Sequence, residues 1–353
     1  FFSSRMATIS PQGGDSSGYH QWNAVKHTSV GGRNYQEDRA KQVDDFNKLV
    51  PASNTSLDRS VRRSLFCIFD GHGGDACSQY CYDNFHKFLA ENAKVGEDPK
   101  AALLETFDAV EKGFEARILA RYERNQKNFK PKNDTDKVKF PCDGSTATVC
   151  FVVGNLMYVA SCGDSTCAAF KKDKTVERFT REHHTVDPEE VARIEAAGGE
   201  FIQKTFKAPA PFPYCCTKMV DKPLGKPRVY PGGLLVTRAF GDFQAKLPIG
   251  GGKPGTVIHN PDPIREVEVD PSSWQYFIVA SDGVWDALTD KQIVKVMKTE
   301  KEDAEFDYGK KEESQEKVRK RICKGLVESS TDSPYWSRNN AEADNTTAII
   351  LFF

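Results

Sequence analysis

Three apolar runs in this chain end at, or lie just after, an aspartate, and this repeated construction constrains the fold more than any other feature. Residues 65–69 run into Asp70, residues 276–280 run through a serine into Asp282, and Asp344 precedes the last apolar run. Apolar runs of this length, bounded by turn residues, are typical of buried β-strands. A carboxylate placed where a buried strand surfaces is costly unless a cation meets it. The pattern therefore predicts strands that deliver acidic side chains to a cation.

The first of these runs continues into the segment Asp70-Gly71-His72-Gly73-Gly74. Glycine allows a sharp turn and a close approach of a ligand to the backbone, and histidine can carry a proton near neutral pH. Taken alone, the segment is equally consistent with a plain Asp-Gly turn before a helix. The repetition of the construction elsewhere in the chain favours a functional site.

Acidic residues lie beside the predicted strands in similar settings, next to Gly, Ser or Asn or at the end of an apolar run. They are Glu37, Asp38, Asp70, Asp164, Asp282, Asp286 and Asp344. A site of carboxylates without Cys or His suits Mg²⁺ or Mn²⁺ rather than zinc or copper. Glu37 and Asp38 are adjacent, so on a strand they point to opposite faces and at most one ligates directly without a bend. A single acid of this kind is usually a surface charge or a helix cap; the shared setting of several favours a metal site.

Arg33 lies five residues before Asp38. An arginine beside an acidic metal cluster either pairs with one of the acids or clamps a bound anion with two parallel N–H groups. The sequence leaves these two roles equally open.

Composition and missing motifs exclude several classes of protein. Lys and Arg number 49 against 50 Asp and Glu, so the net charge of −1 gives no general electrostatic case for nucleic acid or membrane binding. The chain has no Gly-x4-Gly-Lys-[Ser/Thr] loop, Gly-x-Ser-x-Gly elbow or His-Glu-x-x-His helix, and no Cys followed by Arg six positions later.

No apolar stretch reaches transmembrane length and no signal-peptide core is present, so we expect an intracellular protein, cytoplasmic or nuclear. Most cysteines lie in apolar or small-residue surroundings, which predicts reduced, buried thiols.

Strands come in blocks along the chain, with helices in pairs between them. Helical spacing is predicted over residues 75–92 and 99–122, whereas residues 200–233 are rich in Pro and Lys and lack clean periodicity. Such an order favours an α+β fold with antiparallel sheets over alternating βαβ units. Core strands from both ends of the chain indicate a single domain over residues 21–353, after a loose N-terminal segment, residues 1–20.

Seven motifs follow one another along the chain: Arg33-x-x-x-Glu37-Asp38, Asp70-Gly71-His72-Gly73-Gly74, Gly144-Ser145-Thr146-Ala147, Gly163-Asp164-Ser165, Thr237-Arg238-Ala239-Phe240-Gly241-Asp242, Ser281-Asp282-Gly283-Val284-Trp285-Asp286 and Asp344-Asn345-x-Thr347. In type and order they resemble the metal-dependent protein phosphatase family, type 2C. A lone Asp-Gly-His is a weak signal, but seven ordered motifs spanning residues 33–347 are specific.

The resemblance implies a four-layer α-β-β-α sandwich with two central antiparallel sheets. It implies an enzyme, a metal-dependent serine/threonine phosphatase that hydrolyses phosphoserine and phosphothreonine in proteins with two Mg²⁺ or Mn²⁺ ions. Its partners are then phosphorylated proteins, and we expect a monomer with no nucleic-acid partner and no transmembrane segment.

The resemblance also assigns metal ligands. Six positions match those that hold two ions in the family: Glu37, Asp38, Asp70, Gly71, Asp282 and Asp344. Asp70 would bridge both ions, the Gly71 carbonyl would help to hold one, and Asp282 and Asp344 would hold the other. Glu37 and Asp38 would act mostly through metal-bound water. Two further acids match a third, weaker metal position of some members: Asp164 and Asp286.

The resemblance assigns two catalytic residues, and the chain departs from the family in three places. Arg33 would bind the substrate phosphate and His72 would be the general acid. The connection over residues 200–233, where members carry a flap, is longer than usual, and residues 329–342 also look enlarged. Glu182-His183-His184 replaces a commoner Asp-His-Lys. These departures concern the choice of substrate more than the chemistry.

Overall fold

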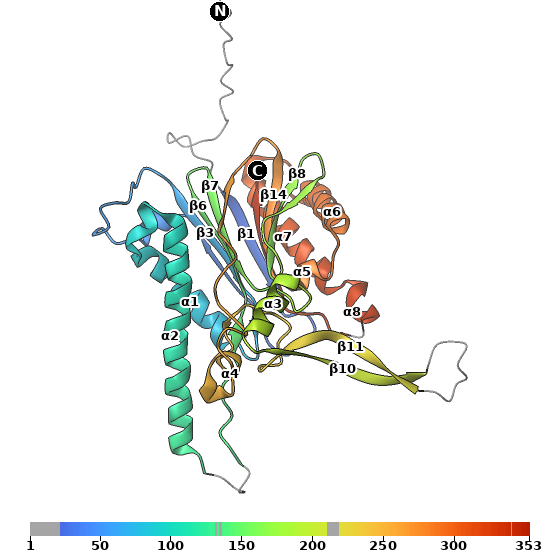
Figure 1. Ribbon diagram of the computed structural model, residues 1–353. Helices are drawn as coiled ribbons and strands as arrows, with labels where there is room; N and C mark the ends of the chain where they lie inside the picture. Colours follow the sequence, from blue (N-terminus) through green and yellow to red (C-terminus); the bar gives the residue numbers. More distant parts are fainter. Residues whose placement is uncertain (1–21, 131–132, 134–135, 210–218, 340) are drawn as a thin grey trace, which may run out of the picture.

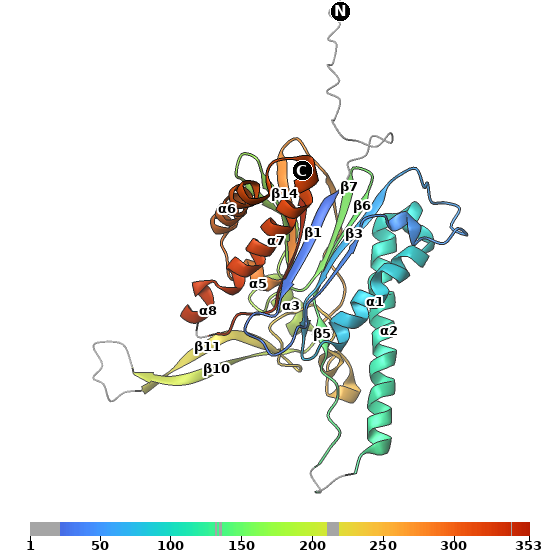
Figure 2. The same cartoon turned by 180° about the vertical axis from the view of Figure 1, so that it is seen from behind.

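Two five-stranded antiparallel sheets lie face to face at the centre of the molecule, with helices on both outer sides (Figures 1 and 2). The computed structural model describes residues 22–353 except 131–132, 134–135, 210–218 and 340. The predicted α+β, four-layer architecture is therefore confirmed. The N-terminal segment predicted to be loose, residues 1–20, lies outside the described residues.

Each sheet mixes strands from distant parts of the chain. The first sheet has, in spatial order, β1 (Asn23–Ser29), β15 (Thr346–Phe352), β14 (Trp274–Ala280), β8 (Thr166–Lys171) and β9 (Val176–Arg178). The second has β13 (Arg265–Glu268), β7 (Leu156–Cys162), β6 (Ala147–Val153), β3 (Arg63–Phe69) and β2 (Arg39–Val43). Because the first strand pairs with the last, both ends of the described chain are built into one sheet.

The apolar runs are continuous because both faces of their strands are buried. Along β14, Tyr276 and Ile278 pack toward the outer helices, whereas Phe277 and Val279 pack between the two sheets. β3 alternates in the same way, with Leu65 and its i+2 neighbours facing the helices of the other side. A strand sandwiched between two layers has no polar face, which removes the period-2 alternation expected of a half-exposed strand.

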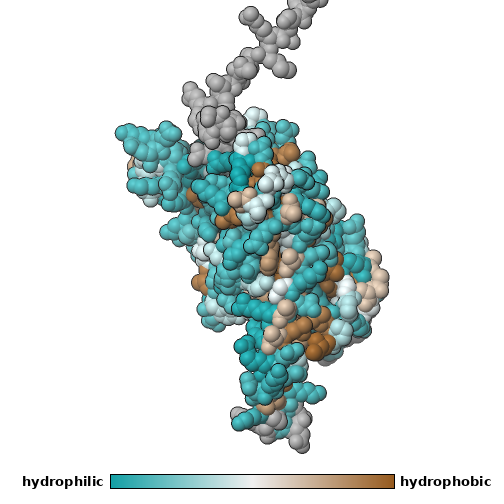
Figure 3. Space-filling model, turned by 90° about the vertical axis from the view of Figure 1, so that its left-hand side faces the viewer, coloured by the Kyte–Doolittle hydropathy of each residue, from teal (hydrophilic) through white to brown (hydrophobic). Residues whose placement is uncertain are grey.

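Two pairs of helices form the outer layers. On the second sheet these are α1 (Ala76–Glu91) and α2 (Pro99–Asn128); on the first sheet α7 (Gln315–Thr331) packs on the strands, with α6 (Asp290–Tyr308) against it. α1 buries Cys77, Cys81, Phe85 and Leu89, which recur at helical spacing. The outward face on the α2 side is mainly hydrophilic (Figure 3). None of the described helices is long and apolar enough to cross a membrane.

Several boundaries differ from the sequence prediction. α2 reaches Asn128 rather than residue 122, since the charged residues there extend a solvent-exposed helix. The segment 329–342 contains the end of α7 and a short helix, α8 (Pro334–Arg338), and is not simply a loop. The predicted reduced thiols are confirmed as buried and unpaired: Cys67, Cys77, Cys81, Cys150, Cys162 and Cys167.

The largest correction concerns residues 200–233. Within this segment two described strands, β10 (Glu200–Pro209) and β11 (Met219–Tyr230), pair as a long β-hairpin, which projects from the body of the molecule (Figure 1). Most of its described side chains are exposed on both faces. A ribbon with two exposed faces needs no apolar alternation, so its sequence gave no period-2 signal.

Candidate metal centre

The acids identified in the sequence gather where the strands of both sheets end. Asp38 directly precedes β2, and Asp70 directly follows β3. These two strands pair with Arg39 opposite Phe69, so the two acids lie at the same end of the strand pair. Asp282 follows β14, and Asp344 lies just ahead of the neighbouring strand β15. Asp164 lies on the short connection that passes from β7 in one sheet to β8 in the other. The antiparallel registers thus bring residues from five parts of the chain to one edge of the sandwich.

Three of these acids form a tight cluster. Asp70, Asp164 and Asp282 each offer a carboxylate oxygen, and the three oxygens lie within 4.8 Å of one another. Burial raises the pKa of Asp70 and of Asp282 well above the usual aspartate value, and the charges of the neighbouring carboxylates add to the effect. These groups resist ionisation because no counter-charge among the described residues offsets their burial. Carboxylate oxygens this close together suit a hard divalent cation as ligands.

The environment of Asp38, beside the cluster, also indicates a cation site. Its side chain is buried, and its Oδ2 accepts a hydrogen bond from Ser281 Oγ at 2.8 Å. No donor among the described residues reaches its buried Oδ1. Burial raises the pKa of Asp38 to about 6. A buried carboxylate oxygen without a partner is unusual in a folded protein, and a metal ion or its water would satisfy it.

Glu37 and Gly71 lie beside the cluster. Glu37 Oε1 accepts the backbone N–H of Gly74 at 2.8 Å, so its carboxylate faces the turn after Asp70. A Cβ at Gly71 would lie 2.6 Å from the Glu37 carbonyl oxygen and 2.7 Å from Ser78 Oγ. Glycine at position 71 therefore lets the segment bearing Glu37 approach the turn closely.

Asp344 and Asp286 lie at the edges of the cluster. Asp344 raises the pKa of both Asp70 and Asp282 by its charge, which places it within electrostatic range of them. Asp286 directly follows the short helix α5 (Asp282–Trp285), and its charge also raises the pKa of Asp282. Of the two acids assigned to a third metal position, Asp164 belongs to the tight cluster and Asp286 does not.

Arg33 pairs with one of the acids. Its Nη2 donates to Asp344 Oδ2 at 2.7 Å, and about half of the Arg33 side chain is exposed to solvent. Of the two roles that the sequence left open, the structure contains the ion pair. The exposed half of the guanidinium still faces solvent beside the cluster.

His72 has a partner that the sequence did not single out. Its Nε2 lies 2.7 Å from Oδ2 of the fully buried Asp242. Burial alone would lower the pKa of His72, but the Asp242 carboxylate raises it above the usual histidine value. The pair therefore favours the protonated form of an imidazole next to the carboxylate cluster.

A small sheet brings His72 and Asp242 together. It consists of β12 (Phe240–Gly241), β5 (Gly144–Ser145) and β4 (Gly71–His72), with β5 in the middle. A Cβ at Gly144 would lie 2.3 Å from both His72 Nε2 and Asp242 Oδ2, so only glycine fits beneath the pair. This close contact explains why the motif Gly144-Ser145-Thr146-Ala147 begins with glycine.

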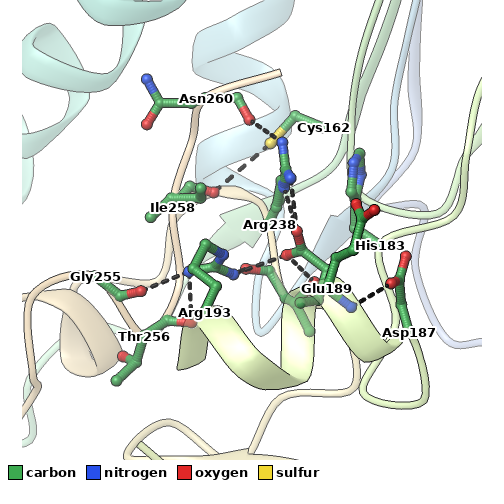
Figure 4. A network of polar contacts seen from close by, with 12 residues as sticks. Cys162, His183, Asp187, Glu189, Arg193, Arg238, Gly255, Thr256, Ile258 and Asn260 are labelled. Carbon is green, nitrogen blue, oxygen red and sulfur yellow. Dashed lines mark hydrogen bonds and ion pairs between the residues drawn. The ribbon is translucent and has the colours of Figure 1, made fainter. Parts of the chain in front are cut away.

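A network of charged side chains surrounds α3 (Pro188–Ala196) (Figure 4). The buried Glu190 accepts hydrogen bonds from Arg193, Arg238 and Thr237. Although burial opposes it, these donors lower the pKa of Glu190 to about 2. Arg238 Nη1 also lies 3.1 Å from Asp262 Oδ1, which links this carboxylate to the same network.

The network reaches the cluster through His183. Its Nε2 lies 3.0 Å from Asp262 Oδ1, and its Nδ1 lies 3.1 Å from the backbone nitrogen and 2.9 Å from the carbonyl oxygen of Gly163. Depending on the tautomer, Nδ1 accepts the Gly163 N–H or donates to the Gly163 carbonyl oxygen. His183 thereby holds the peptide unit that precedes Asp164. The next residue, His184, lies with Nδ1 3.8 Å from Asp164 Oδ2.

Comparisons with known proteins agree with this geometry. A family profile described as Protein phosphatase 2C matches residues 29–331. "Probable protein phosphatase 2C 55" of Oryza sativa subsp. japonica is 30% identical over 237 residues, which cover 67% of this chain and 50% of that protein. "Probable protein phosphatase 2C 11" of Arabidopsis thaliana is 30% identical over 236 residues, with 67% and 50% covered. The chain thus spans about half the length of these curated relatives.

Solved structures share the fold. The serine-threonine phosphatase 2C from Toxoplasma gondii superposes with a TM-score of 0.63 at 21% identity, over 95% of this chain and 96% of that one. A C. elegans sex determining protein gives the same TM-score at 22% identity, over 95% of this chain and 65% of that one. The length of the family match, with its motifs assembled at one edge of two sheets, shows that this chain belongs to the protein phosphatase 2C family.

Proposed function

We propose that this protein hydrolyses phosphoserine and phosphothreonine in phosphorylated proteins, as a monomer, with two Mg²⁺ or Mn²⁺ ions at the carboxylate cluster. The observation that carries the proposal is the cluster of Asp70, Asp164 and Asp282 in a chain of this family, with the pair of His72 and Asp242 beside it. Nothing but oxygen is offered by the cluster, which suits these hard cations.

The chain's own residues would divide the work of holding the ions. Asp70, Asp282 and Asp344 would hold them through their carboxylates, with help from the Gly71 carbonyl. Glu37 and Asp38 would act through water, with the unpartnered Asp38 Oδ1 as one acceptor. When bound, two such ions lower the pKa of water and neutralise charge on the phosphate during in-line transfer. Asp164, with Asp286 farther out, would serve a third and weaker position.

Two side chains would act on the substrate itself. Arg33 would offer the exposed part of its guanidinium to the phosphate oxygens, with Asp344 fixing the other part. His72 would give the imidazolium proton to the serine or threonine oxygen as it leaves, because an alkoxide is a poor leaving group. Asp242 would keep His72 protonated until that step.

One experiment tests the proposal directly. Phosphate release from a phosphothreonine peptide is measured with Mg²⁺, with Mn²⁺ and with excess EDTA. We expect release that depends on either ion and stops with the chelator. Full activity in EDTA contradicts the two-metal proposal, and no release with either ion contradicts the proposed hydrolysis.

His183 provides a prediction about metal affinity. His183→Ala removes the side chain that hydrogen-bonds the Gly163 backbone and should weaken binding of Mn²⁺, measured by calorimetry, by about 10- to 100-fold, the range for residues that orient metal ligands. His183→Asn keeps an acceptor oxygen close to the position of Nδ1 and should restore most of the affinity. Equal losses in both variants would mean that the ring only fills space.

The hairpin formed by β10 and β11 is the part of the chain that we expect to select substrates. Its cross-strand pairs place Lys204 beside Leu224 and Phe206 beside Lys222 on one face. The other face carries Lys207 with Asp221, whose side chains pair at 2.9 Å. Among its described residues the first face is thus basic and apolar without a pairing acid, which suits acidic segments of a phosphoprotein.

Neutralising this face should change substrate preference more than chemistry. Lys204→Gln, alone or with Lys222→Gln, should lower kcat/KM for acidic phosphopeptides relative to neutral ones by about two- to fivefold per lysine, the range for exposed ion pairs. Hydrolysis of p-nitrophenyl phosphate should stay near wild type, and the difference should shrink at high salt. Lys207→Gln, on the paired face, is the matched control. An unchanged ranking of peptides at low salt would show that this face selects nothing.

A further inference from the structure

A groove lies far from the carboxylate cluster, between α6 and the ends of β8 and β14. Its volume is about 450 Å³. β8 begins beside Asp164 and ends at the groove, whereas β14 begins at the groove and ends beside Asp282. At about 3.3 Å per residue, these strands separate the groove from the cluster by about 20 Å.

The groove has an excess of positive charge. Two glutamates, Glu302 and Glu305, line it together with six lysines: Lys171, Lys172, Lys174, Lys298, Lys301 and Lys310. This excess is local, because the chain as a whole has a net charge of −1.

The pairing of these lysines is incomplete. Lys301 and Lys310 share Glu305, at 4.0 and 3.5 Å. The Lys172 ammonium donates only to backbone carbonyls, those of Pro271 and Ser272, at 3.0 Å each. Lys171 pairs with Glu177 at 2.8 Å and Lys298 with Glu302 at 3.7 Å, whereas Lys172 and Lys174 have no carboxylate partner within 4.0 Å in the described part of the chain. The groove therefore retains capacity for further carboxylates.

The type of cation indicates the type of anion. The groove is lined by lysines and no arginine, so it lacks the planar fork that matches a phosphate group. Flexible, separate ammonium groups suit several carboxylates spread along a chain. An acidic peptide meets this description better than a compact phosphorylated ligand.

Apolar side chains add a second kind of contact. Phe170, Tyr276 and Met297 contribute to the groove wall. Phe306, which is 89% exposed, lies one helical turn after the groove residue Glu302 and so on the same side of α6. An aromatic side chain this exposed, beside a groove with apolar walls, suits a partner segment that carries a large apolar residue.

We propose that this groove is a docking site for an acidic peptide segment of a partner protein, in which a large apolar side chain lies among the carboxylates. The acids would meet the lysines of β8 and α6, and the apolar side chain would pack against Phe306 and the groove wall. Binding here involves none of the residues of the metal centre, so it does not depend on the proposed hydrolysis.

The test uses fluorescence anisotropy of the full chain with a fluorescein-labelled peptide of glutamates around one leucine and one phenylalanine. The charge-reversal variant Lys174→Glu/Lys298→Glu/Lys301→Glu should weaken binding by at least about tenfold, as expected for several exposed charge pairs lost together. The matched control, Lys87→Glu/Lys112→Glu/Lys127→Glu, reverses three exposed lysines on α1 and α2 and should bind like wild type. Wild-type affinity should also fall with added salt.

A second variant tests the apolar contact without risk to the fold. Phe306→Ser should weaken the peptide that contains phenylalanine and leave an all-glutamate peptide unaffected. Equal binding by the groove and control variants, or equal binding of a peptide with glutamine in place of glutamate, overturns the proposal. Displacement of the peptide by inorganic phosphate in the presence of Mn²⁺ also overturns it, because the peptide would then lie at the metal centre. Binding of phosphatidylserine vesicles but not of the peptide would assign the groove to a membrane surface instead.

Discussion

Asp70→Asn and Asp282→Asn should each lower phosphate release from a phosphothreonine peptide by at least about 10³-fold, because metal ions at such a site supply several kcal/mol of charge stabilisation in the transition state. Both acids contribute to the tight cluster, and the neighbouring charges that act on them are carboxylates. Raising the Mg²⁺ or Mn²⁺ concentration should recover part of the activity if the loss lies in metal affinity. The measurement is a metal titration of the initial rate.

The same substitutions should stabilise the protein when metal is absent. Burial and the neighbouring carboxylates raise the pKa of Asp70 and Asp282 in the folded state. At neutral pH both groups are ionised in the unfolded chain, so the folded state alone bears the penalty of their charge. An asparagine of the same shape removes that penalty. The Tm of either variant in EDTA should therefore exceed that of the wild type, which also shows that lost activity is not lost folding.

Glu195→Gln is the matched control for this experiment. Glu195 is an exposed acid on α3, outside the cluster, and its neutralisation should change neither the rate nor the Tm in EDTA. A wild-type rate for Asp70→Asn at limiting metal would contradict the proposed role of Asp70 in holding the metal ions. A lower Tm in EDTA would contradict the view that the cluster is repulsive without its ions.

The acids of the cluster could be predicted from sequence because each lies at a strand end that the apolar runs mark. Asp70 and Asp282 directly follow such runs, and antiparallel registers bring those ends to one edge. The distances between them could not be predicted. They depend on how the two sheets are stacked and on the β7–β8 connection, which places Asp164 inside the cluster and leaves Asp286 outside it.

Asp242 shows where sequence reasoning fails. It belongs to a recognised motif, but 170 residues separate it from His72, and only the small sheet of β12, β5 and β4 brings them together. Strands of two residues carry no periodicity, so the sequence gives no sign of their pairing. The glycine at position 144, which lies beneath the pair, was the available signal. The hairpin of residues 200–230 was missed for a related reason, since a ribbon exposed on both faces has no apolar pattern.

His72→Ala should affect substrates according to how much their leaving groups need a proton. A serine alkoxide leaves badly, so loss of the general acid should slow hydrolysis of a phosphoserine peptide by about 10²- to 10⁴-fold. p-Nitrophenolate leaves readily without protonation, so the rate on p-nitrophenyl phosphate should fall much less. The ratio of the two losses is the measurement. Equal losses on both substrates would assign His72 a structural role.

Asp242 allows the same idea to be tested through pH. Its carboxylate raises the pKa of His72, so Asp242→Asn should lower that pKa. A general acid works only while protonated, and its contribution is lost as the pH rises through its pKa. The pH above which kcat for the phosphoserine peptide declines should therefore move to lower values in Asp242→Asn, while the profile for p-nitrophenyl phosphate stays in place. If both profiles moved together, the titrating group would belong to the attack on phosphorus, and the proton donor would have to be sought elsewhere at the cluster.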